Sequence, residues 1–196
     1  MTGGELKRAK RTVRTEVRTV RDAMPSAERR RRSAAIAERA LSLAEVRDAG
    51  VVLAFWSFGS EVDTAPLLRA LHEGGKTVAL PRIVEGDLEP RVYSPGDPLE
   101  ATSFGALEPA DGVGLDPGEI DVIVTPAVAF DRSGRRVGYG GGFYDRFLPR
   151  TRGDALRLGI AFDLQVVSGD LPGGGFDVRV DAIATETAVV RCRRDA

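Results

Sequence analysis

Ile120-Asp-Val-Ile-Val-Thr-Pro-Ala-Val-Ala-Phe130 leads directly into Asp131-Arg-Ser-Gly-Arg-Arg-Val-Gly-Tyr-Gly-Gly-Gly-Phe-Tyr-Asp-Arg146, so an apolar segment rich in β-branched residues is followed by a glycine-rich loop. An apolar run of this kind is typical of a strand buried on both faces of a sheet. Open α/β sheets bind ligands beyond the carboxyl ends of such strands. The sequence therefore predicts a ligand site in the loop that follows Phe130.

The loop contains glycine at positions 134, 138, 140, 141 and 142. Glycine allows positive φ and lets several N–H groups approach an anion. Two arginines and the closing Asp145 add charge and a candidate Mg²⁺ ligand. Residues 143–148, which stop at Pro149, are predicted to form a short helix whose first turn presents free N–H groups to phosphate. A flexible surface turn is the alternative interpretation.

Two common nucleotide signatures fit this chain less well. The segment Gly138–Phe143 has phenylalanine where a dinucleotide fingerprint needs its third glycine. Residues 70–77 match a relaxed P-loop pattern, but they are predicted as the end of a helix followed by a strand, which is the reverse of the P-loop order. We therefore interpret Gly74 and Gly75 as the C-terminal cap of that helix.

Hydrophobic periodicity along the chain alternates between helix and strand. We expect helices over 7–23, 26–47, 64–73 and 143–148, and strands over 51–58, 77–81, 91–93, 121–125, 156–162, 180–184 and 188–191. The fold class is therefore α/β: a single three-layer domain over 1–196, with a mainly parallel sheet, helices on both faces, an antiparallel edge and an N-terminal helical pair. Residues 94–118 are expected to form a long loop, a candidate lid or substrate wall.

Composition excludes several kinds of site. The chain has 196 residues, of which 42% are hydrophobic, and it contains one cysteine and one histidine. A single cysteine, Cys192, excludes an intrachain disulfide and a cysteine metal cage. The single histidine, His72, leaves little for Ser-His-Asp catalysis or a multi-histidine zinc site. No signal-peptide pattern or membrane-length apolar run is present, so we expect a cytoplasmic protein without a membrane segment.

Basic charge is concentrated at the N-terminus. The net charge is −1, yet residues 1–40 carry 12 Lys and Arg against 5 acidic residues. A nucleic-acid-binding arm that includes Arg29–Arg32 is one interpretation, and two amphipathic helices with solvated arginine faces are another. A third is more specific: Lys10 and Arg14 lie four residues apart, so on a helix they share a face and can both reach one polyphosphate.

Several blocks occur in a characteristic order along the chain. They are Lys10-Arg-Thr-Val-Arg14, Phe58-Gly-Ser-Glu-Val-Asp-Thr64, Gly75-Lys-Thr-Val-Ala-Leu-Pro-Arg82, Phe104-Gly-Ala-Leu-Glu-Pro109, residues 125–146 with the glycine loop, and the tail Leu158-Gly-Ile-Ala161, Gln165 and Asp177-Val-Arg-Val-Asp181. Together they resemble the 5-formyltetrahydrofolate cyclo-ligase family, also called 5,10-methenyltetrahydrofolate synthetase. The resemblance covers nearly the whole chain, and the glycine-loop block is distinctive of the family.

The resemblance implies an ATP- and Mg²⁺-dependent ligase that converts 5-formyltetrahydrofolate to 5,10-methenyltetrahydrofolate with release of ADP and phosphate. In the family's mechanism the formyl oxygen attacks the γ-phosphate, N10 of the folate closes on the activated carbon, and phosphate leaves. Such chemistry needs alignment and charge neutralisation more than a nucleophilic side chain. The expected partners are ATP and the folate, with no membrane and no nucleic acid, and a monomer is the favoured state.

The resemblance also assigns individual residues. Those that match ATP contacts are Lys10, Arg14, Arg136, Val137, Gly138, Tyr139, Gly140, Gly141, Gly142, Phe143 and Tyr144. Trp56 and Glu61 match substrate-binding positions, where Glu61 would accept hydrogen bonds from the pterin and Trp56 would offer a flat apolar wall. A core role is the alternative for Trp56. Asp145 and Asp177 match the Mg²⁺ ligands, and Asp181 is the rival of Asp177.

The chain departs from the family pattern at three positions of the loop. Tyr139 and Gly141 stand where some members carry basic residues. The phosphate charge is therefore expected to fall more heavily on Arg135, Arg136, Lys10, Arg14 and the metal. Phe143 replaces a commoner tyrosine. For Lys76 and Arg82, a ligand role and a structural ion pair both stay open. Two other functions also stay open: a nucleic-acid-binding module that uses the basic helices, and a sugar-phosphate or acyl-CoA enzyme that uses the phosphate loop.

Overall fold

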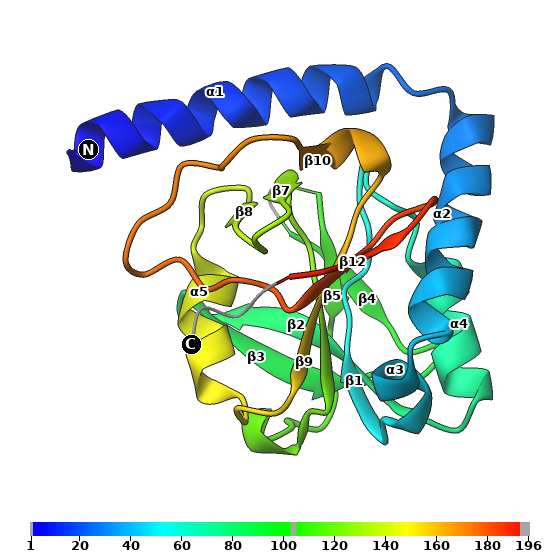
Figure 1. Ribbon diagram of the computed structural model, residues 1–196. Coiled ribbons are helices and arrows are strands. Elements are labelled where there is room, and N and C mark those ends of the chain that lie inside the picture. Colours follow the sequence, from blue (N-terminus) through cyan, green and yellow to red (C-terminus); the bar gives the residue numbers. More distant parts are fainter. Residues whose placement is uncertain (1, 103–104, 193–196) are drawn as a thin grey trace.

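The computed structural model describes residues 2–102 and 105–192, and its centre is a twisted, mostly parallel sheet (Figure 1). The described residues of this sheet form seven strands in the order β12-β11-β9-β6-β1-β2-β3. They are β1 (Val51–Leu53), β2 (Thr77–Val84), β3 (Asp87–Val92), β6 (Val122–Thr125), β9 (Leu156–Ile160), β11 (Ala182–Ala184) and β12 (Val189–Arg191). The helices are α1 (Gly3–Asp22), α2 (Ser26–Leu41), α3 (Ala44–Asp48), α4 (Ala65–Glu73) and α5 (Phe143–Phe147).

The strand order indicates where a ligand is expected to bind. Neighbouring strands are parallel from β2 through β1, β6 and β9 to β11, whereas β3 and β12 are antiparallel to their neighbours. After β1, the next strands of this sheet, β2 and β3, are added on one side of β1. The later strands β6, β9, β11 and β12 are added in turn on its other side. Since β1 and β6 are adjacent, the order reverses between them, and a crevice forms beyond their carboxyl ends.

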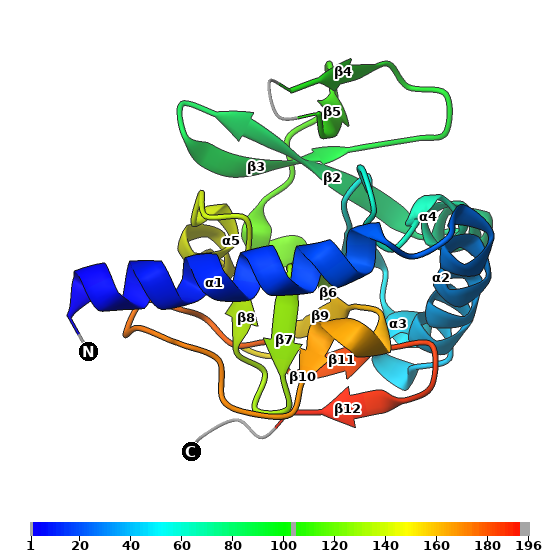
Figure 2. The same ribbon diagram turned by 90° about the horizontal axis from the view of Figure 1, so that it is seen from above.

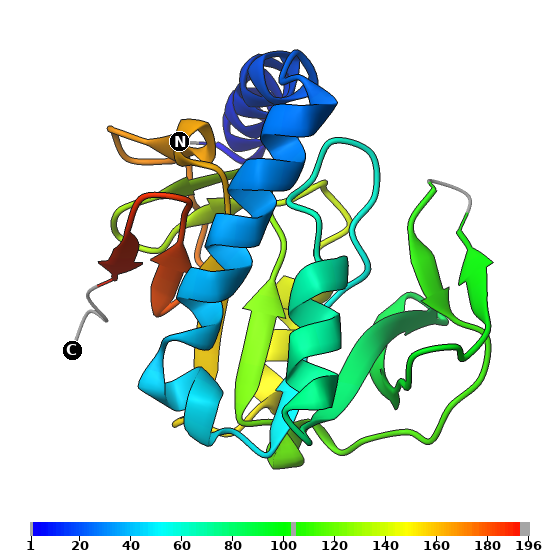
Figure 3. The same cartoon turned by 90° about the vertical axis from the view of Figure 1, so that its right-hand side faces the viewer.

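Helices cover both faces of the sheet, as the α/β prediction requires. Alternate residues of β1 point to opposite sides: Val52 joins the core under α2 and α4, and Leu53 joins the core under α5. Figure 3 shows α2 and α4 side by side on one face. The fold class is confirmed, and an antiparallel strand closes the sheet at both edges rather than at one.

Helix α1 lies across the carboxyl ends of the strands (Figure 2). Thr2 and Glu5 cap its N-terminus in a reciprocal capping box, which starts the helix at Gly3, four residues before the predicted start. Val17 anchors its inner face in a small core with Val128 and Val137. The helix is thereby fixed with one side facing the crevice.

Some predicted boundaries were wrong. The helix expected over 26–47 is interrupted at Leu43, whose extended backbone separates α2 from α3. The strand expected over 51–58 ends at Leu53, and Trp56 makes only an isolated bridge to Leu107. The run 120–130 is not one strand, because Pro126 separates β6 from β7 (Ala129–Asp131), which pairs with β8 (Arg136–Val137) and β10 (Val166–Val167) in a smaller sheet.

The region expected to be a strand over 91–93 and a loop over 94–118 has more structure than predicted. Strands β2 and β3 form a hairpin through Glu85 and Gly86, whose φ values of 51° and 88° suit a two-residue turn. Within 94–118, β4 (Leu99–Ala101) pairs with β5 (Leu107–Pro109). This arm projects to one side of the sheet (Figure 2). Phe104 of the Phe104–Pro109 block lies outside the described residues.

The helix before the double glycine ends as predicted. Gly74 caps α4, and Gly75 follows with a φ of 75°. Strand β2 begins two residues later, so this segment is helix then strand and cannot be a P-loop.

Candidate functional site

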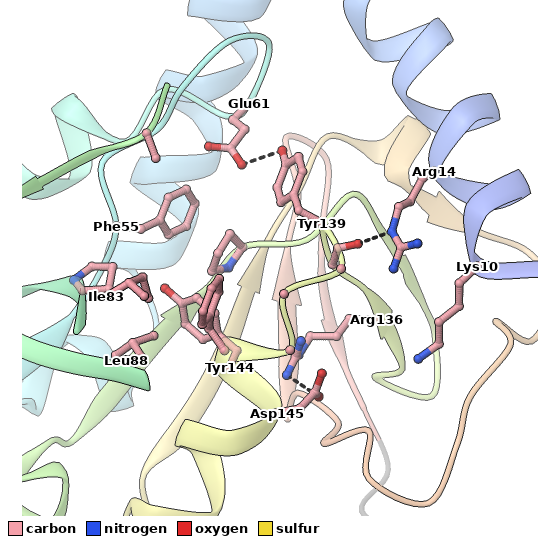
Figure 4. A pocket seen from close by; sticks show the side chains of 18 of the residues that line it. Lys10, Arg14, Phe55, Glu61, Ile83, Leu88, Arg136, Tyr139, Tyr144 and Asp145 are labelled. Carbon is pink, nitrogen blue, oxygen red and sulfur yellow. Dashed lines mark hydrogen bonds and ion pairs between the residues drawn. The ribbon is translucent and has the colours of Figure 1, made fainter. Parts of the chain in front are cut away.

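A cleft of about 880 Å³ opens at the reversal of strand order (Figure 4). Its walls come from the segments after β1 and β6, the β2–β3 hairpin, the glycine loop with α5, the Leu107 region of the arm, and one face of α1. The cleft therefore joins segments from both ends of the chain, at the position that the strand order predicts for a ligand.

One side of the cleft is apolar. Phe55 and Trp56 follow β1 and Pro126 follows β6, and the hairpin adds Ile83 and Leu88. Figure 4 shows Phe55, Ile83 and Leu88 close together at this end. Trp56 is half-buried, and its ring meets Tyr93 edge-on with centroids 5.9 Å apart. Trp56 is thus both a packing residue and part of the wall, so its two interpretations do not exclude each other.

The opposite side is cationic because α1 presents a stripe of basic residues to it. Lys7, Lys10, Arg14 and Arg18 all line the cleft, and their spacing of three or four residues keeps them on one helical face. The Arg14 Nε donates to the carbonyl oxygen of Gly138 at 2.6 Å, which ties α1 to the glycine loop. Burial lowers the pKa of Arg14, although arginine stays charged at neutral pH.

The glycine loop lies between these two sides and depends on its glycines. Gly140 has a φ of 115° and Gly142 a φ of 69°, both in the region that favours glycine. At Gly141 a Cβ atom would sit 2.4 Å from the ring of Phe143, so a side chain there would displace that ring. These constraints explain the three consecutive glycines from Gly140 to Gly142.

Two carboxylates at the base of the loop are each held by a cation. The Lys10 Nζ lies 2.6 Å from Asp177 Oδ2 and 2.7 Å from Oδ1. Arg136, whose side chain is 4% exposed, donates to Asp145 Oδ1 at 2.8 Å, and Oδ1 also accepts from the Val178 N–H at 3.1 Å. Burial alone would raise the pKa of Asp177, but Lys10 and the Gly174 N–H together hold it below its usual value.

A third carboxylate, Glu61, is buried at the far end of the loop. Its Oε1 accepts from the Tyr139 hydroxyl at 2.6 Å, and its Oε2 accepts from the Phe58 N–H at 3.0 Å. The buried Arg21 of α1 donates to the Tyr139 hydroxyl at 3.2 Å. Burial raises the pKa of Glu61, and the Tyr139, Phe58 and Arg21 interactions oppose that rise.

Tyr144 contributes an unusual polar group to the wall of the cleft. Its hydroxyl is buried and has no hydrogen-bond partner among the described residues. Burial raises the pKa of this phenol well above its ordinary value, so it is neutral at physiological pH. An unpartnered buried hydroxyl costs stability, and at a ligand site it is a candidate contact for the ligand.

The residues present fit a Mg²⁺ ion that arrives with a polyphosphate. Among the described residues no group of three or more His, Cys, Asp or Glu side chains could hold a metal by itself. The cleft offers Asp145 and Asp177 instead. Mg²⁺ is commonly held by one or two carboxylates together with substrate phosphates and water, so this donor set suits it.

Comparison with known proteins agrees with this geometry. A model of the 5-formyltetrahydrofolate cyclo-ligase family matches residues 6–186. The chain belongs to the 5-formyltetrahydrofolate cyclo-ligase family. It is 34% identical over 172 residues to the 5-formyltetrahydrofolate cyclo-ligase of Haemophilus influenzae, which covers 85% of this chain and 91% of that protein. The Escherichia coli enzyme of the same name is 36% identical over 159 residues, 78% of this chain and 87% of that protein.

A solved structure extends the agreement to the fold. The NMR structure of Aquifex aeolicus 5,10-methenyltetrahydrofolate synthetase superimposes with a TM-score of 0.83 and 34% identity, covering 95% of this chain and 94% of that one. Membership of the cyclo-ligase family makes this chain an enzyme of the ligase class. Separately, no helix in the described part of the chain is both long enough and apolar enough to span a membrane.

The structure brings almost all of the site residues predicted from the cyclo-ligase motifs into this one cleft. Those that line it are Lys10, Arg14, Trp56, Glu61, Arg136, Gly138, Tyr139, Gly140, Gly141, Gly142, Phe143, Tyr144, Asp145 and Asp177. Val137 does not line it, because its side chain is fully buried in the core beneath α1. Asp181 does not line it either: its Oδ2 accepts from the Arg157 N–H at 2.9 Å, beside β9.

Three cations considered in the sequence analysis lie elsewhere. Arg135 faces Asp170 at 3.9 Å and is not part of the cleft wall. The Lys76 Nζ donates to the carbonyl oxygens of Arg47 and Ala49, at the end of α3. Arg82 donates to the carbonyl oxygens of Pro109 and Ala110 and so pins the arm to the hairpin. Neither Lys76 nor Arg82 lines the cleft.

Sequence reasoning missed several cleft residues. Lys7 and Arg18, and Arg21 behind the loop, continue the helical period that Lys10 and Arg14 begin, so extending that period would have found them. Ile83 and Leu88 carry no comparable signal, because an apolar residue in a hairpin is expected to pack in a core whether or not it faces a ligand.

Proposed function

We propose that this cyclo-ligase uses Mg²⁺ and ATP to convert 5-formyltetrahydrofolate to 5,10-methenyltetrahydrofolate, releasing ADP and phosphate. The nucleotide phosphates occupy the cationic side, between the glycine loop and α1. The pterin occupies the apolar side, between Trp56 and the β2–β3 hairpin. The observation that carries the proposal is the arrangement of Lys10, Arg14 and the glycine loop in one cleft with Glu61.

The cationic side supports binding of a triphosphate. Lys10 and Arg14 approach from α1 and Arg136 from the loop, so three cations surround one space. The attraction between these cations and a phosphate is stronger in the partly buried cleft than it would be in bulk water, because the effective dielectric constant is lower there. Tight loop geometry at Gly140 and Gly142 keeps side chains out of the path of an incoming phosphate.

The apolar side supports binding of the folate ring. Aromatic and aliphatic side chains bury a flat ring, and a few polar groups then fix its orientation. Glu61 is the group we assign to the N–H donors of the pterin, and the unpartnered Tyr144 hydroxyl is a second polar contact for the folate.

The chemistry follows from placing the two substrates together. The formyl oxygen attacks the γ-phosphorus, and the bond from that phosphorus to the bridging oxygen of ADP breaks. N10 then closes on the activated formyl carbon, the carbon–oxygen bond breaks, and phosphate leaves with the former formyl oxygen while N10 loses its proton. The protein aligns the reactants and neutralises phosphate charge, which is why this route needs no nucleophilic side chain.

Asp145 and Asp177 are the residues that would hold Mg²⁺. When bound, the ion neutralises charge on the transferred phosphoryl group. The other contributions come from the chain itself: Lys10, Arg14 and Arg136 bind phosphate oxygens, and the cleft walls exclude water from the activated folate.

The proposal is tested by mixing the purified chain with Mg-ATP and 5-formyltetrahydrofolate and recording the near-ultraviolet absorbance of the methenyl product. Product should accumulate only when ATP, Mg²⁺ and folate are all present. A sugar phosphate and coenzyme A serve as alternative ligands in a thermal-shift panel. If either of them stabilises the protein and no ATP-dependent product forms, the proposal is contradicted and a sugar-phosphate or acyl-CoA enzyme is indicated instead.

The basic helices have a structural explanation as well. Arg32 pairs with Glu28 and Glu186, and Arg39 donates to the carbonyl oxygens of Thr185 and Glu186. Two arginines of α2 thus hold the turn between β11 and β12 in place. This supports the interpretation of α2 as an amphipathic helix.

A further inference from the structure

The side chain of Tyr139 points away from the cationic end of the cleft. Although Tyr139 belongs to the glycine loop, its hydroxyl donates to Glu61 Oε1 at 2.6 Å, and Figure 4 shows it directed toward Glu61 rather than toward Lys10 or Arg136. Its ring packs against Phe58 with centroids 5.3 Å apart. The loop that we assign to phosphate therefore touches the residue that we assign to the pterin.

Arg21 fixes the tyrosine from behind. The Arg21 side chain is buried, its guanidinium lies 6.0 Å from the centre of the Tyr139 ring, and it donates to the Tyr139 hydroxyl and, at 3.0 Å, to Ser60 Oγ. Ser60 in turn donates to Asp22. The C-terminal end of α1, through Arg21, and the segment that carries Glu61 thus both bond to the hydroxyl group of Tyr139 in the glycine loop.

We infer that Tyr139 is a positioning residue for folate binding: its hydroxyl, held by Arg21, orients the Glu61 carboxylate toward the folate. This rests on the proposed function, because it takes Glu61 as the folate contact. A carboxylate with Tyr139 on Oε1 and the Phe58 N–H on Oε2 has a fixed plane, and its remaining lone pairs then face defined directions.

The same contacts favour the ionised form of Glu61 and so oppose the effect of its burial, which raises its pKa. Burial favours the protonated acid, which can no longer accept two hydrogen bonds from N–H donors. The described charged and titratable groups that act on Glu61 are Arg21 from α1, Tyr139 from the loop and Tyr144 from α5. Both phenols stay neutral, since their pKa values are raised by burial, so Arg21 supplies the positive charge and Tyr139 the hydrogen bond.

The test is Tyr139→Phe, which removes the hydroxyl and keeps the ring. Trp56 is the chain's single tryptophan and lines the cleft, so its fluorescence can report binding of 5-formyltetrahydrofolate. We expect the Kd for 5-formyltetrahydrofolate to rise about tenfold, as for the loss of a hydrogen bond to a charged group. The pH below which folate binding is lost should move upward, because Glu61 protonates more easily. The Kd for a non-hydrolysable Mg-ATP analogue should change less than about twofold.

Two further variants separate positioning from packing. Glu61→Gln cannot titrate, so its folate binding should be weak and should not weaken further through protonation at position 61 as the pH falls. In the double variant, Tyr139→Phe should raise the Kd for folate little beyond the value for Glu61→Gln alone. Thr19→Val is the control, because it removes an exposed hydroxyl that donates to the Thr15 carbonyl oxygen and does not line the cleft. Circular dichroism and thermal unfolding establish that each variant is folded.

The inference fails if Tyr139→Phe binds folate with unchanged Kd and pH dependence, or if its Kd for the nucleotide analogue rises as much as its Kd for folate. It also fails if the effects of Tyr139→Phe and Glu61→Gln on the free energy of folate binding are additive in the double variant. Failure of the proposed function looks different: the unsubstituted chain would then not bind 5-formyltetrahydrofolate at all.

Discussion

Lys10 and Asp177, 167 positions apart in the sequence, form an ion pair with a Nζ–Oδ2 distance of 2.6 Å. A second pair, Arg136 and Asp145, lies in the same cleft. Each pair joins a cation that we assign to phosphate with a carboxylate that we assign to Mg²⁺. Binding of Mg-ATP would therefore exchange partners: the cations would turn to the phosphates as the carboxylates turn to the ion. In the ligand-free structure each carboxylate therefore keeps a cationic partner within the cleft.

Lys10→Ala should raise the KM for ATP about tenfold, because it removes one charged contact to phosphate. The KM for 5-formyltetrahydrofolate should change much less, since Lys10 lies on the cationic side. Steady-state kinetics with each substrate varied in turn measure both values. Arg8→Ala, on the exposed side of the same helix, is the control. Equal increases in both KM values would contradict the assignment of that side to the nucleotide.

Asp145→Asn should lower kcat/KM for Mg-ATP by at least about 100-fold. Mutation of a residue that only hydrogen-bonds a metal ligand already lowers metal affinity or activity by about 10–100-fold, and loss of a ligand should cost more. It should also lower the melting temperature by several degrees, since it leaves the buried Arg136 without its counter-charge. Asp87→Asn removes a carboxylate from an exposed pair with Arg146 and should change neither quantity. Near-normal turnover in folded Asp145→Asn would rule out the metal role.

Gly140→Ala should weaken nucleotide binding while the rest of the fold persists. Its φ of 115° is one that alanine avoids, so the loop must leave its present shape. Gly153→Ala is the matched control, because an added Cβ there meets no atom within 4 Å. Calorimetric titration with a Mg-ATP analogue should show a higher Kd for the first variant only. An unchanged Kd would mean that the loop shape does not matter for the nucleotide.

Tyr144→Phe should raise the free energy of unfolding of the ligand-free protein by up to about 1 kcal/mol, because it removes a buried hydroxyl that has no hydrogen-bond partner in the described part of the chain. The same change should raise the KM for 5-formyltetrahydrofolate, since we assign this hydroxyl a contact with the folate. Thermal unfolding and kinetics measure the two effects. A variant that is less stable than the unsubstituted chain, with an unchanged KM, would show that the hydroxyl serves the fold instead.

Much of the fold could be read from local patterns. The β-branched run before Pro126 predicts β6, and the glycines at 74 and 75 predict the end of α4, because both depend on intrinsic backbone preferences. The β4–β5 pair was not predictable in this way. Its residues lie in a stretch rich in proline, glycine and acids, and a distant side chain, Arg82, holds it in place.

Part of the candidate site could also be predicted from local sequence patterns. The glycine loop stands out because backbone geometry demands glycine, and Lys10 and Arg14 follow from helical spacing. Val137 was predicted because the segment 136–144 matches the phosphate-binding loop of the family, whereas its side chain turns into the core. The contact of Tyr139 with Glu61 spans 78 positions, so no local pattern could indicate it.

The proposed reaction requires that the released phosphate carries the former formyl oxygen. The direct measurement uses 5-formyltetrahydrofolate labelled with ¹⁸O in the formyl group, followed by mass spectrometry of the inorganic phosphate released in one turnover with Mg-ATP. We expect one ¹⁸O atom in each phosphate. Unlabelled phosphate, with the ¹⁸O recovered in water, would contradict it.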